Sequence, residues 1–242
     1  MGVITFNGIT STSLGIKVWT APEYSTPEKD VTSVHVPGRN GDILIDNGVY
    51  KNATRTYQVS LYDTSHDYTY LSHVIANWVH SANGYARLED SYDSTVYRMA
   101  VYAESMTFSN VLNKATVAKL TFSCKPQRFL KTGESEVTVS SSITNNTRFT
   151  SRPKITVTKS GSGIGSFTFG GTTVTIALGS PTTIVIDSEL RDCYYISGGT
   201  IQNGNIYVSF SNGFPELKPG SNAITGKSSI STVKVVPNWW TI

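Results

Sequence analysis

Apolar and polar residues alternate in short runs along most of the chain. A period of two places successive side chains on opposite faces of a β-strand, so each run predicts a strand with one buried face. The runs are residues 31–36, 55–61, 117–122, 155–158, 172–178, 183–186, 206–210 and 231–235. We therefore predict a mainly β protein in which sheets pack face to face.

Turn residues separate these runs. Asn-Gly pairs readily adopt the positive φ angles that two-residue hairpin turns require. Six such pairs occur, at Asn7, Asn40, Asn47, Asn83, Asn203 and Asn212. Charged residues make up only 15% of the chain, which is typical of short strands and tight turns rather than of long surface helices.

One segment follows a helical period instead. Its apolar residues recur at the i, i+3, i+4, i+7 and i+8 positions of one helix face: Leu71, Val74, Ile75, Trp78 and Val79. Asp63, Thr64 or Ser65 could cap the start of this helix, and the Asn-Gly pair at 83–84 could end it. We predict a single α-helix over residues 68–82 that packs on a sheet face.

The character of the chain changes between residues 122 and 155. Lys125-Pro126 is expected to end a strand, and a polar stretch rich in Ser, Thr and Asn covers residues 135–150. We predict an N-terminal β-rich domain with the helix over residues 1–130 and a second domain over residues 131–242. Short strands and glycine-rich turns in the second domain predict a β-sandwich.

The charge and cysteine content limit the classes of function that the chain could have. Residues 1–130 carry 11 basic and 11 acidic side chains, and residues 131–242 carry nine and six, without the basic cluster that gripping nucleic acid requires. Cys124 and Cys193, one in each predicted domain, are expected to be free thiols in a reducing cytoplasm. The opening residues do not resemble a secretion signal, and no apolar run is long enough to span a membrane.

Two patterns could indicate a metal or a phosphate site, but neither has the spacing or the residues that such a site requires. His66, His73 and His80 are spaced by seven residues, and seven residues of helix rise about 10 Å, too far for one shared ion. Residues 161–165 read Gly-Ser-Gly-Ile-Gly, but the P-loop lysine is missing and a strand-like run follows. We predict no metal, no cofactor and no catalytic residue.

Adjacent aromatic residues leave three interpretations open. Tyr194-Tyr195 and Trp239-Trp240 lie in strand-like context, where neighbouring side chains point to opposite faces. One member of each pair could therefore form a subunit contact, stack on a sugar ring, or be covered within the chain.

Four separated motifs, in this order, resemble the distal tail protein family of siphophages. The motifs are residues 6–16, residues 36–52, residues 122–129 and residues 214–224. The second is the most recognisable, because a turn with fixed φ angles holds an arginine and leads into a hairpin that ends near Tyr50. The residues of that turn are Gly38, Arg39, Asn40, Gly41 and Asp42.

The resemblance implies a structural virion protein of the phage tail tip, made in the cytoplasm of the host bacterium. The first domain would form the body of a ring, usually of six copies, which is the baseplate hub. The second would be a sandwich similar to galectins or carbohydrate-binding modules. The implied partners are further copies of the chain, the tail tube protein, the tape measure protein, a tail-associated lysin or fibre protein, and a receptor-binding protein.

A closed ring needs two different complementary patches on each subunit. We select the hairpin residues Gly38, Arg39, Asn40, Gly41, Asp42 and Tyr50 as contact candidates, together with Trp239, Trp240 and the amphipathic helix. DNA is expected to pass through the ring without specific binding. The alternatives are a receptor-recognition module that binds carbohydrate through the C-terminal sandwich, and a cell-wall hydrolase that uses paired carboxylates such as Asp187 and Glu189.

Overall fold

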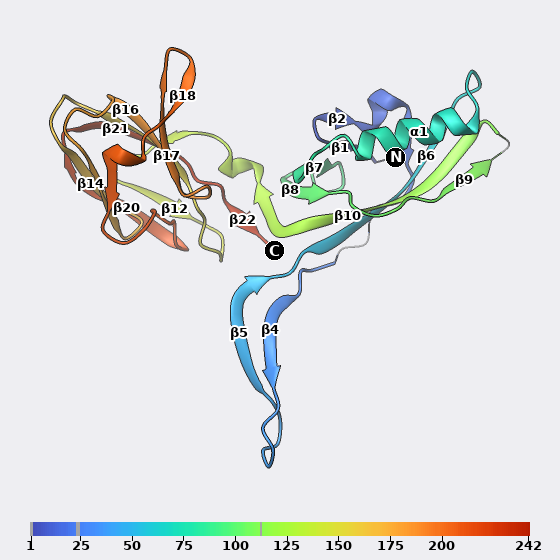
Figure 1. The fold of residues 1–242 in the computed structure, drawn as a ribbon, viewed down its shortest axis with the longest axis horizontal. Helices are drawn as coiled ribbons and strands as arrows, with labels where there is room; N and C mark the ends of the chain where they lie inside the picture. Colours follow the sequence, from blue (N-terminus) through green and yellow to red (C-terminus); the bar gives the residue numbers. More distant parts are fainter. Residues whose placement is uncertain (1, 23–24, 112) are drawn as a thin grey trace. The chain divides into compact units, whose positions relative to one another are not determined.

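The computed structural model of the chain describes residues 2–22, 25–111 and 113–242. It divides into two compact units, Met1–Arg128 with Ile242 (the N-terminal unit) and Phe129–Thr241 (the C-terminal unit). Both consist mainly of antiparallel strands, and the described residues contain one α-helix, α1 (Figure 1). The prediction of a mainly β protein with one helix is confirmed.

The N-terminal unit is built on one sheet in the order β2-β1-β7-β8-β10-β6-β3, with β9 also pairing with β10. Its strands are β1 (Ile4–Phe6), β2 (Ile9–Thr10), β3 (Ile16–Val18), β6 (Ala53–Tyr62), β7 (Ala86–Asp90), β8 (Val96–Val101), β9 (Phe108–Val111) and β10 (Ala115–Leu130), whose last two residues belong to the C-terminal unit, as does the short strand β22 (Trp240–Thr241). A 3-10 turn, η1 (Ser11–Leu14), joins β2 to β3. The backbone N–H of Gly2, two residues before β1, bonds to the carbonyl of Val18 in β3 at 3.3 Å, so the two ends of the strand order approach each other and the sheet curls.

The first hairpin follows directly from its Asn-Gly pair. Asn7 and Gly8 both have positive φ angles, 50° and 78°, and they turn β1 back onto β2. These are the angles of a turn whose twist matches the twist of its strands.

Helix α1 (Tyr68–Val79) buries the apolar face that its sequence predicts. Leu71, Ile75, Trp78 and Val79 belong to the core of the N-terminal unit, and Val74 packs against it while half-buried. The predicted start at residue 68 is confirmed, but the cap residue and the end of the helix differ from the prediction. Asp67 is the N-cap, because its carboxylate accepts from the N–H of Tyr70 at 2.9 Å.

The predicted cap residues lie before this helix. The Asp63 carboxylate instead accepts from the N–H of Ser65 and contacts His66, so it organises the preceding turn. The helix stops at Val79 with His80 as its C-cap, before the Asn-Gly pair at 83–84.

Strand β10 is longer than the sequence predicts. Its pairing with β6 ends at Cys124, which faces Ala53, but the strand continues through Pro126 to Leu130. Lys125-Pro126 therefore does not end the strand, because a proline is tolerated where its missing N–H is not needed by a neighbouring strand. Near its end, the N–H of Leu130 bonds to the carbonyl of Trp239 at 2.8 Å.

Two further strands, β4 (Lys29–Val34) and β5 (Ile43–Tyr50), form a separate two-stranded sheet. This hairpin extends as an arm from the strand β6 that follows it (Figure 1). Asn52 anchors its base to the main sheet through hydrogen bonds to the hydroxyls of Tyr85 and Ser123.

The C-terminal unit is a β-sandwich of two sheets. One sheet has the order β11 (Val137–Thr138), β21 (Ile230–Val236), β13 (Lys154–Lys159), β16 (Thr183–Asp187), β17 (Asp192–Ser197) and β18 (Thr200–Asn203). The other has the order β12 (Ser142–Asn145), β20 (Gly220–Ser228), β14 (Gly165–Phe169), β15 (Thr172–Ile176) and β19 (Val208–Phe210). The 3-10 turns are η2 (Lys131–Gly133) and η3 (Asn205–Tyr207).

Strict alternation of buried residues builds the sandwich core. Strands β13, β14 and β15 bury every second residue, and these side chains meet between the sheets. The predicted strand over residues 206–210 begins too early, because Ile206 lies in the turn η3 and only residues 208–210 pair with β15.

Candidate interaction surfaces

The β4–β5 hairpin is the most exposed strand pair of the N-terminal unit. Within the described part of the chain, its two strands pair only with each other. Both outer edges therefore carry backbone groups that no neighbouring strand satisfies, and such edges are ready to pair with another chain.

Large apolar side chains cover this hairpin although it has no core of its own. Leu44 is 68% exposed, and the other exposed members are Val31, Val34, Ile43, Ile45 and Val49. The alternation that predicted a half-buried strand is therefore present without burial in this chain. Apolar side chains clustered on one surface mark a contact site more often than single exposed ones do.

Polar contacts across the two strands hold the arm together. Lys29 forms an ion pair with Asp46, and Lys51 pairs with Glu28 at 3.1 Å. The Lys29 bond lowers the pKa of the Asp46 carboxyl, with a further contribution from the N–H of Gly48. In turn, the hydrogen bond and charge of Asp46 raise the pKa of Lys29.

The turn motif of the sequence lies at the tip of this arm. Gly38 and Gly41 have φ angles of 84° and 78°, and the N–H of Arg39 bonds to the carbonyl of Val36 at 3.2 Å. The Asp42 carboxylate accepts from the Ser33 hydroxyl at 2.5 Å. Arg39 and Asn40 are exposed between the two glycines.

The other candidate contact residues do not belong to the turn at this tip. Tyr50 is half-buried at the opposite end of β5, at the base of the arm. Trp239 packs against the core of the C-terminal unit, and Trp240 stacks on Phe149 with ring centroids 4.3 Å apart. The indole N–H of Trp240 donates to the carbonyl of Thr150.

The outer face of α1 is the second surface that we selected for ring closure. Tyr70 is 51% exposed there, and its ring stacks on His66 at 4.1 Å. His73 and His80 are also exposed, so the helix presents a surface of aromatic and imidazole rings.

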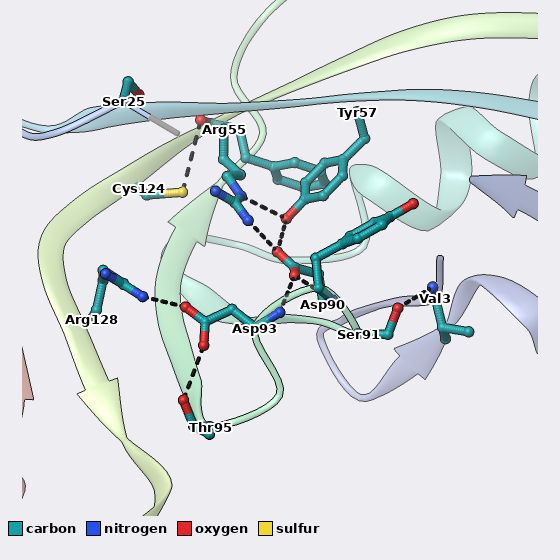
Figure 2. A network of polar contacts seen from close by, with 12 residues as sticks. Val3, Ser25, Arg55, Tyr57, Asp90, Ser91, Asp93, Thr95, Cys124 and Arg128 are labelled. Atoms are coloured by element: carbon teal, nitrogen blue, oxygen red, sulfur yellow. Dashed lines mark hydrogen bonds and ion pairs between the residues drawn. The ribbon is translucent and has the colours of Figure 1, made fainter. Parts of the chain in front are cut away.

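A buried polar network, which the sequence did not single out, lies inside the N-terminal unit (Figure 2). Arg55 donates to the carboxylate of Asp90 at 3.0 Å, and the Tyr57 hydroxyl donates to the same oxygen at 2.6 Å. Arg128 pairs with Asp93, whose carboxylate also accepts from Thr95.

A signal for this network was present in the alternation of residues 55–61. Arg55 and Tyr57 have the same parity as Val59 and Leu61, which are core residues, so both polar side chains had to face inward. Their partners could not be identified because Asp90 comes from a different strand.

Candidate metal sites are absent from residues 2–22, 25–111 and 113–242. These residues contain no group of His, Cys, Asp and Glu side chains that could hold a metal ion. None of the described helices has the length and apolar character needed to cross a membrane. The thiols of Cys124 and Cys193 are buried and unpaired.

Comparison with known proteins identifies the fold. No protein-family model matches the chain, and no curated protein matches it. The crystal structure of the Dit protein (gp 19.1) of phage SPP1 is similar over 97% of this chain and 98% of that one, with a TM-score of 0.74 and 15% identity.

Chains of the phage P2 baseplate are also similar. In its activated conformation with calcium, the match covers 97% of both chains with a TM-score of 0.58 and 10% identity. The strontium form gives a TM-score of 0.56, 10% identity and coverage of 97% of this chain and 96% of that one. At these identities the likeness shows a shared fold that includes both units.

Proposed function

We propose that this protein is a structural subunit of a phage tail tip that forms the hub between the tail tube and the host-adsorption apparatus. The likeness to SPP1 Dit over nearly the full length of both chains carries the proposal. That protein is described as a paradigm of the hub adsorption apparatus in phages that infect Gram-positive bacteria. Both units take part in the match, so the resemblance does not rest on one common domain.

The β4–β5 arm supports assembly into a ring. A ring requires a heterologous contact, in which one patch of a subunit meets a different patch of the next. The arm offers exposed apolar side chains and two free strand edges. In this proposal it lies on the neighbouring subunit, and the outer face of α1 is the candidate for the complementary patch.

The assembly that we propose is a hexamer located in the virion, at the tail tip. Its other partners are the tail tube protein, the tape measure protein, a tail-associated lysin or fibre protein, and a receptor-binding protein. The chain would be made in the cytoplasm of the host bacterium. Its role is structural, and we propose no enzymatic activity.

The ring opening would let DNA pass without holding it. The balanced formal charge of residues 1–130 supports this, because nonspecific grip on DNA depends on clustered Lys and Arg. Binding of duplex DNA at physiological salt with a dissociation constant below about one micromolar would contradict passive passage.

Solution mass of the full-length chain tests the proposal most directly. Light scattering after size-exclusion chromatography, over a range of protein concentrations, is expected to show a closed oligomer of six 26.3 kDa chains. Negative-stain electron microscopy is expected to show rings. A strictly monomeric chain at every concentration, together with its absence from purified virions by mass spectrometry, would refute the proposal.

Carbohydrate recognition by the C-terminal unit is the alternative that we predicted from its sandwich. The aromatic pairs do not strengthen it, since Trp240 stacks on Phe149 and the ring of Tyr195 contacts Tyr207 edge-on at 6.1 Å. A glycan array with the full-length chain separates the two proposals, because a hub subunit requires no sugar binding.

A further inference from the structure

A small cavity of about 20 Å³ lies beside the buried polar network of the N-terminal unit. Basic side chains from β6, β8 and β10 dominate its lining, and these are Arg55, Arg98, Lys125 and Arg128. No carboxylate among the described residues lines it. The hydroxyl-bearing residues Ser25 and Thr54 and the thiol of Cys124 complete the polar part of the wall.

The carboxylates next to this cavity are already engaged. Asp90 accepts from Arg55 and Tyr57 through one oxygen, and from the backbone N–H groups of Tyr92 and Asp93 through the other at 3.0 and 3.1 Å. Asp93 accepts from Arg128 and Thr95. Arg128 also donates to the main-chain oxygen of Ile242 at 3.4 Å.

Arg98 differs from Arg55 and Arg128 in its contacts. It is only 7% exposed, and no hydrogen bond or ion pair joins its guanidinium to any residue that the structure describes. Burial, followed by the charges of Arg55 and Arg128, lowers the pKa of Arg98. An arginine nevertheless stays protonated in proteins, so Arg98 remains a buried cation that is attracted by the charge of Asp90 but has no hydrogen bond to it.

Neither the nearby thiol nor the nearby phenol can neutralise the charge of Arg98. Burial raises the pKa of the Cys124 thiol to about 11, so the group is uncharged near neutral pH. Burial and the neighbouring Asp90 charge raise the pKa of Tyr57 as well, which keeps the phenol protonated. A buried charge that lacks hydrogen bonds is unfavourable, and an anion from outside would relieve that cost.

We propose that this cavity is an oxyanion site in which Arg98 is the principal ligand and Arg55, Arg128 and Lys125 supply the surrounding positive charge. The volume accommodates the centres of about one or two water-sized atoms, which fits two oxygens of a phosphate or carboxylate group. A guanidinium presents paired N–H donors that match such an edge of two oxygens. The site is independent of the ring proposal, because all of its residues belong to one chain.

Thermal unfolding of the full-length chain in inorganic phosphate, acetate and chloride at matched ionic strength tests the site. A specific site is expected to raise the folded-to-unfolded ratio about 100-fold when phosphate is about 100 times its dissociation constant. Chloride at the same ionic strength serves as the control for screening. Acetate reports whether a carboxylate, the chemistry of an acidic side chain, can replace phosphate.

Two variants separate the site from general surface effects. Arg98→Gln is expected to weaken phosphate binding about tenfold to 100-fold, the worth of a charged hydrogen bond. Arg148→Gln removes an exposed arginine of the C-terminal unit and is expected to leave the phosphate effect unchanged. Equal stabilisation of the wild type by phosphate and chloride, or an undiminished phosphate effect in Arg98→Gln, would overturn the proposal.

If Arg98→Gln does not fold, isothermal titration of wild-type protein with phosphate decides the question. Saturable binding of one phosphate per chain, displaced by sulfate, would support the site. Failure to reach saturation at one phosphate per chain would refute it.

Discussion

The Tyr57 hydroxyl donates a 2.6 Å hydrogen bond to the Oδ2 atom of Asp90, deep inside the N-terminal unit. Both side chains are almost fully buried, and Arg55 shares the same carboxylate oxygen. A buried carboxylate tolerates such a position only while its donors remain in place. The bond therefore links the stability of strand β6 to that of β7.

Removal of this donor should destabilise the fold. We expect Tyr57→Phe to lower the free energy of unfolding by about 1.5–3 kcal/mol, because the hydrogen bond reaches a charged acceptor. Tyr62→Phe is the matched control in the same strand, since Tyr62 is 61% exposed, and we expect a change within about 0.5 kcal/mol. Urea unfolding followed by circular dichroism measures both, and equal effects would contradict a structural role for the network.

The two buried thiols should make stability fall in alkali. Burial raises the pKa of Cys124 to about 11 and of Cys193 to about 12, from an ordinary value of 9.0. A raised pKa means that the folded state retains a proton that the unfolded state loses. The contribution is therefore full below pH 9 and is lost as the pH rises toward 11.

Within this window each thiol should reduce the free energy of unfolding by about 1.4 kcal/mol per pH unit. Cys124→Ala is expected to remove its share of the slope, which denaturant unfolding at several pH values from 8 to 11 can measure. An unchanged slope in this variant would show that Cys124 does not titrate as described.

The apolar arm should act in assembly rather than in folding. We expect Leu44→Asp to shift the oligomer toward monomer while changing the free energy of unfolding of the monomer by no more than about 0.5 kcal/mol. Leu178→Asp is a closely matched control, because Leu178 and Leu44 are each 68% exposed and Leu178 lies in the C-terminal unit. Light scattering gives the mass of each variant, and identical masses would exclude Leu44 from the interface.

The tip of the arm has its own test. Arg39 is exposed between two glycines with positive φ angles, so a change of its side chain should not disturb the turn. If the tip contacts the neighbouring subunit, Arg39→Glu should lower the oligomer mass, whereas Arg148→Glu in the C-terminal unit should not. An unchanged mass for Arg39→Glu would remove Arg39 from the contact candidates.

Local periodicity explains which elements could be predicted. The helix face and most strands depend on residues close together in the chain, so their apolar spacing identified them. The cap residue of the helix did not follow in the same way, because Asp63 and Asp67 are both acceptable caps by residue type. The backbone geometry at Asp67, which is extended at that position, decided between them.

The predicted alternation has opposite outcomes in β4 and β13. In β13, Ile155 and Val157 are fully buried, whereas Val31 and Val34 in β4 are exposed. A two-residue period indicates only that the two faces of a strand differ in polarity. Whether another element covers the apolar face depends on the pairing of distant strands, which the local pattern does not contain.

The chain itself determined the mainly β class, the amphipathic helix and the Asn-Gly hairpin turns, because each of these depends on interactions over a few residues. Tertiary structure alone decided that β4–β5 stands uncovered and that Arg55, Asp90 and Arg98 meet from three strands. Their encounter requires the sheet order, which places β10 between β6 and β8. Charges that are separated by many residues in sequence acquire their partners, or lack them, only when the strands close around a common interior.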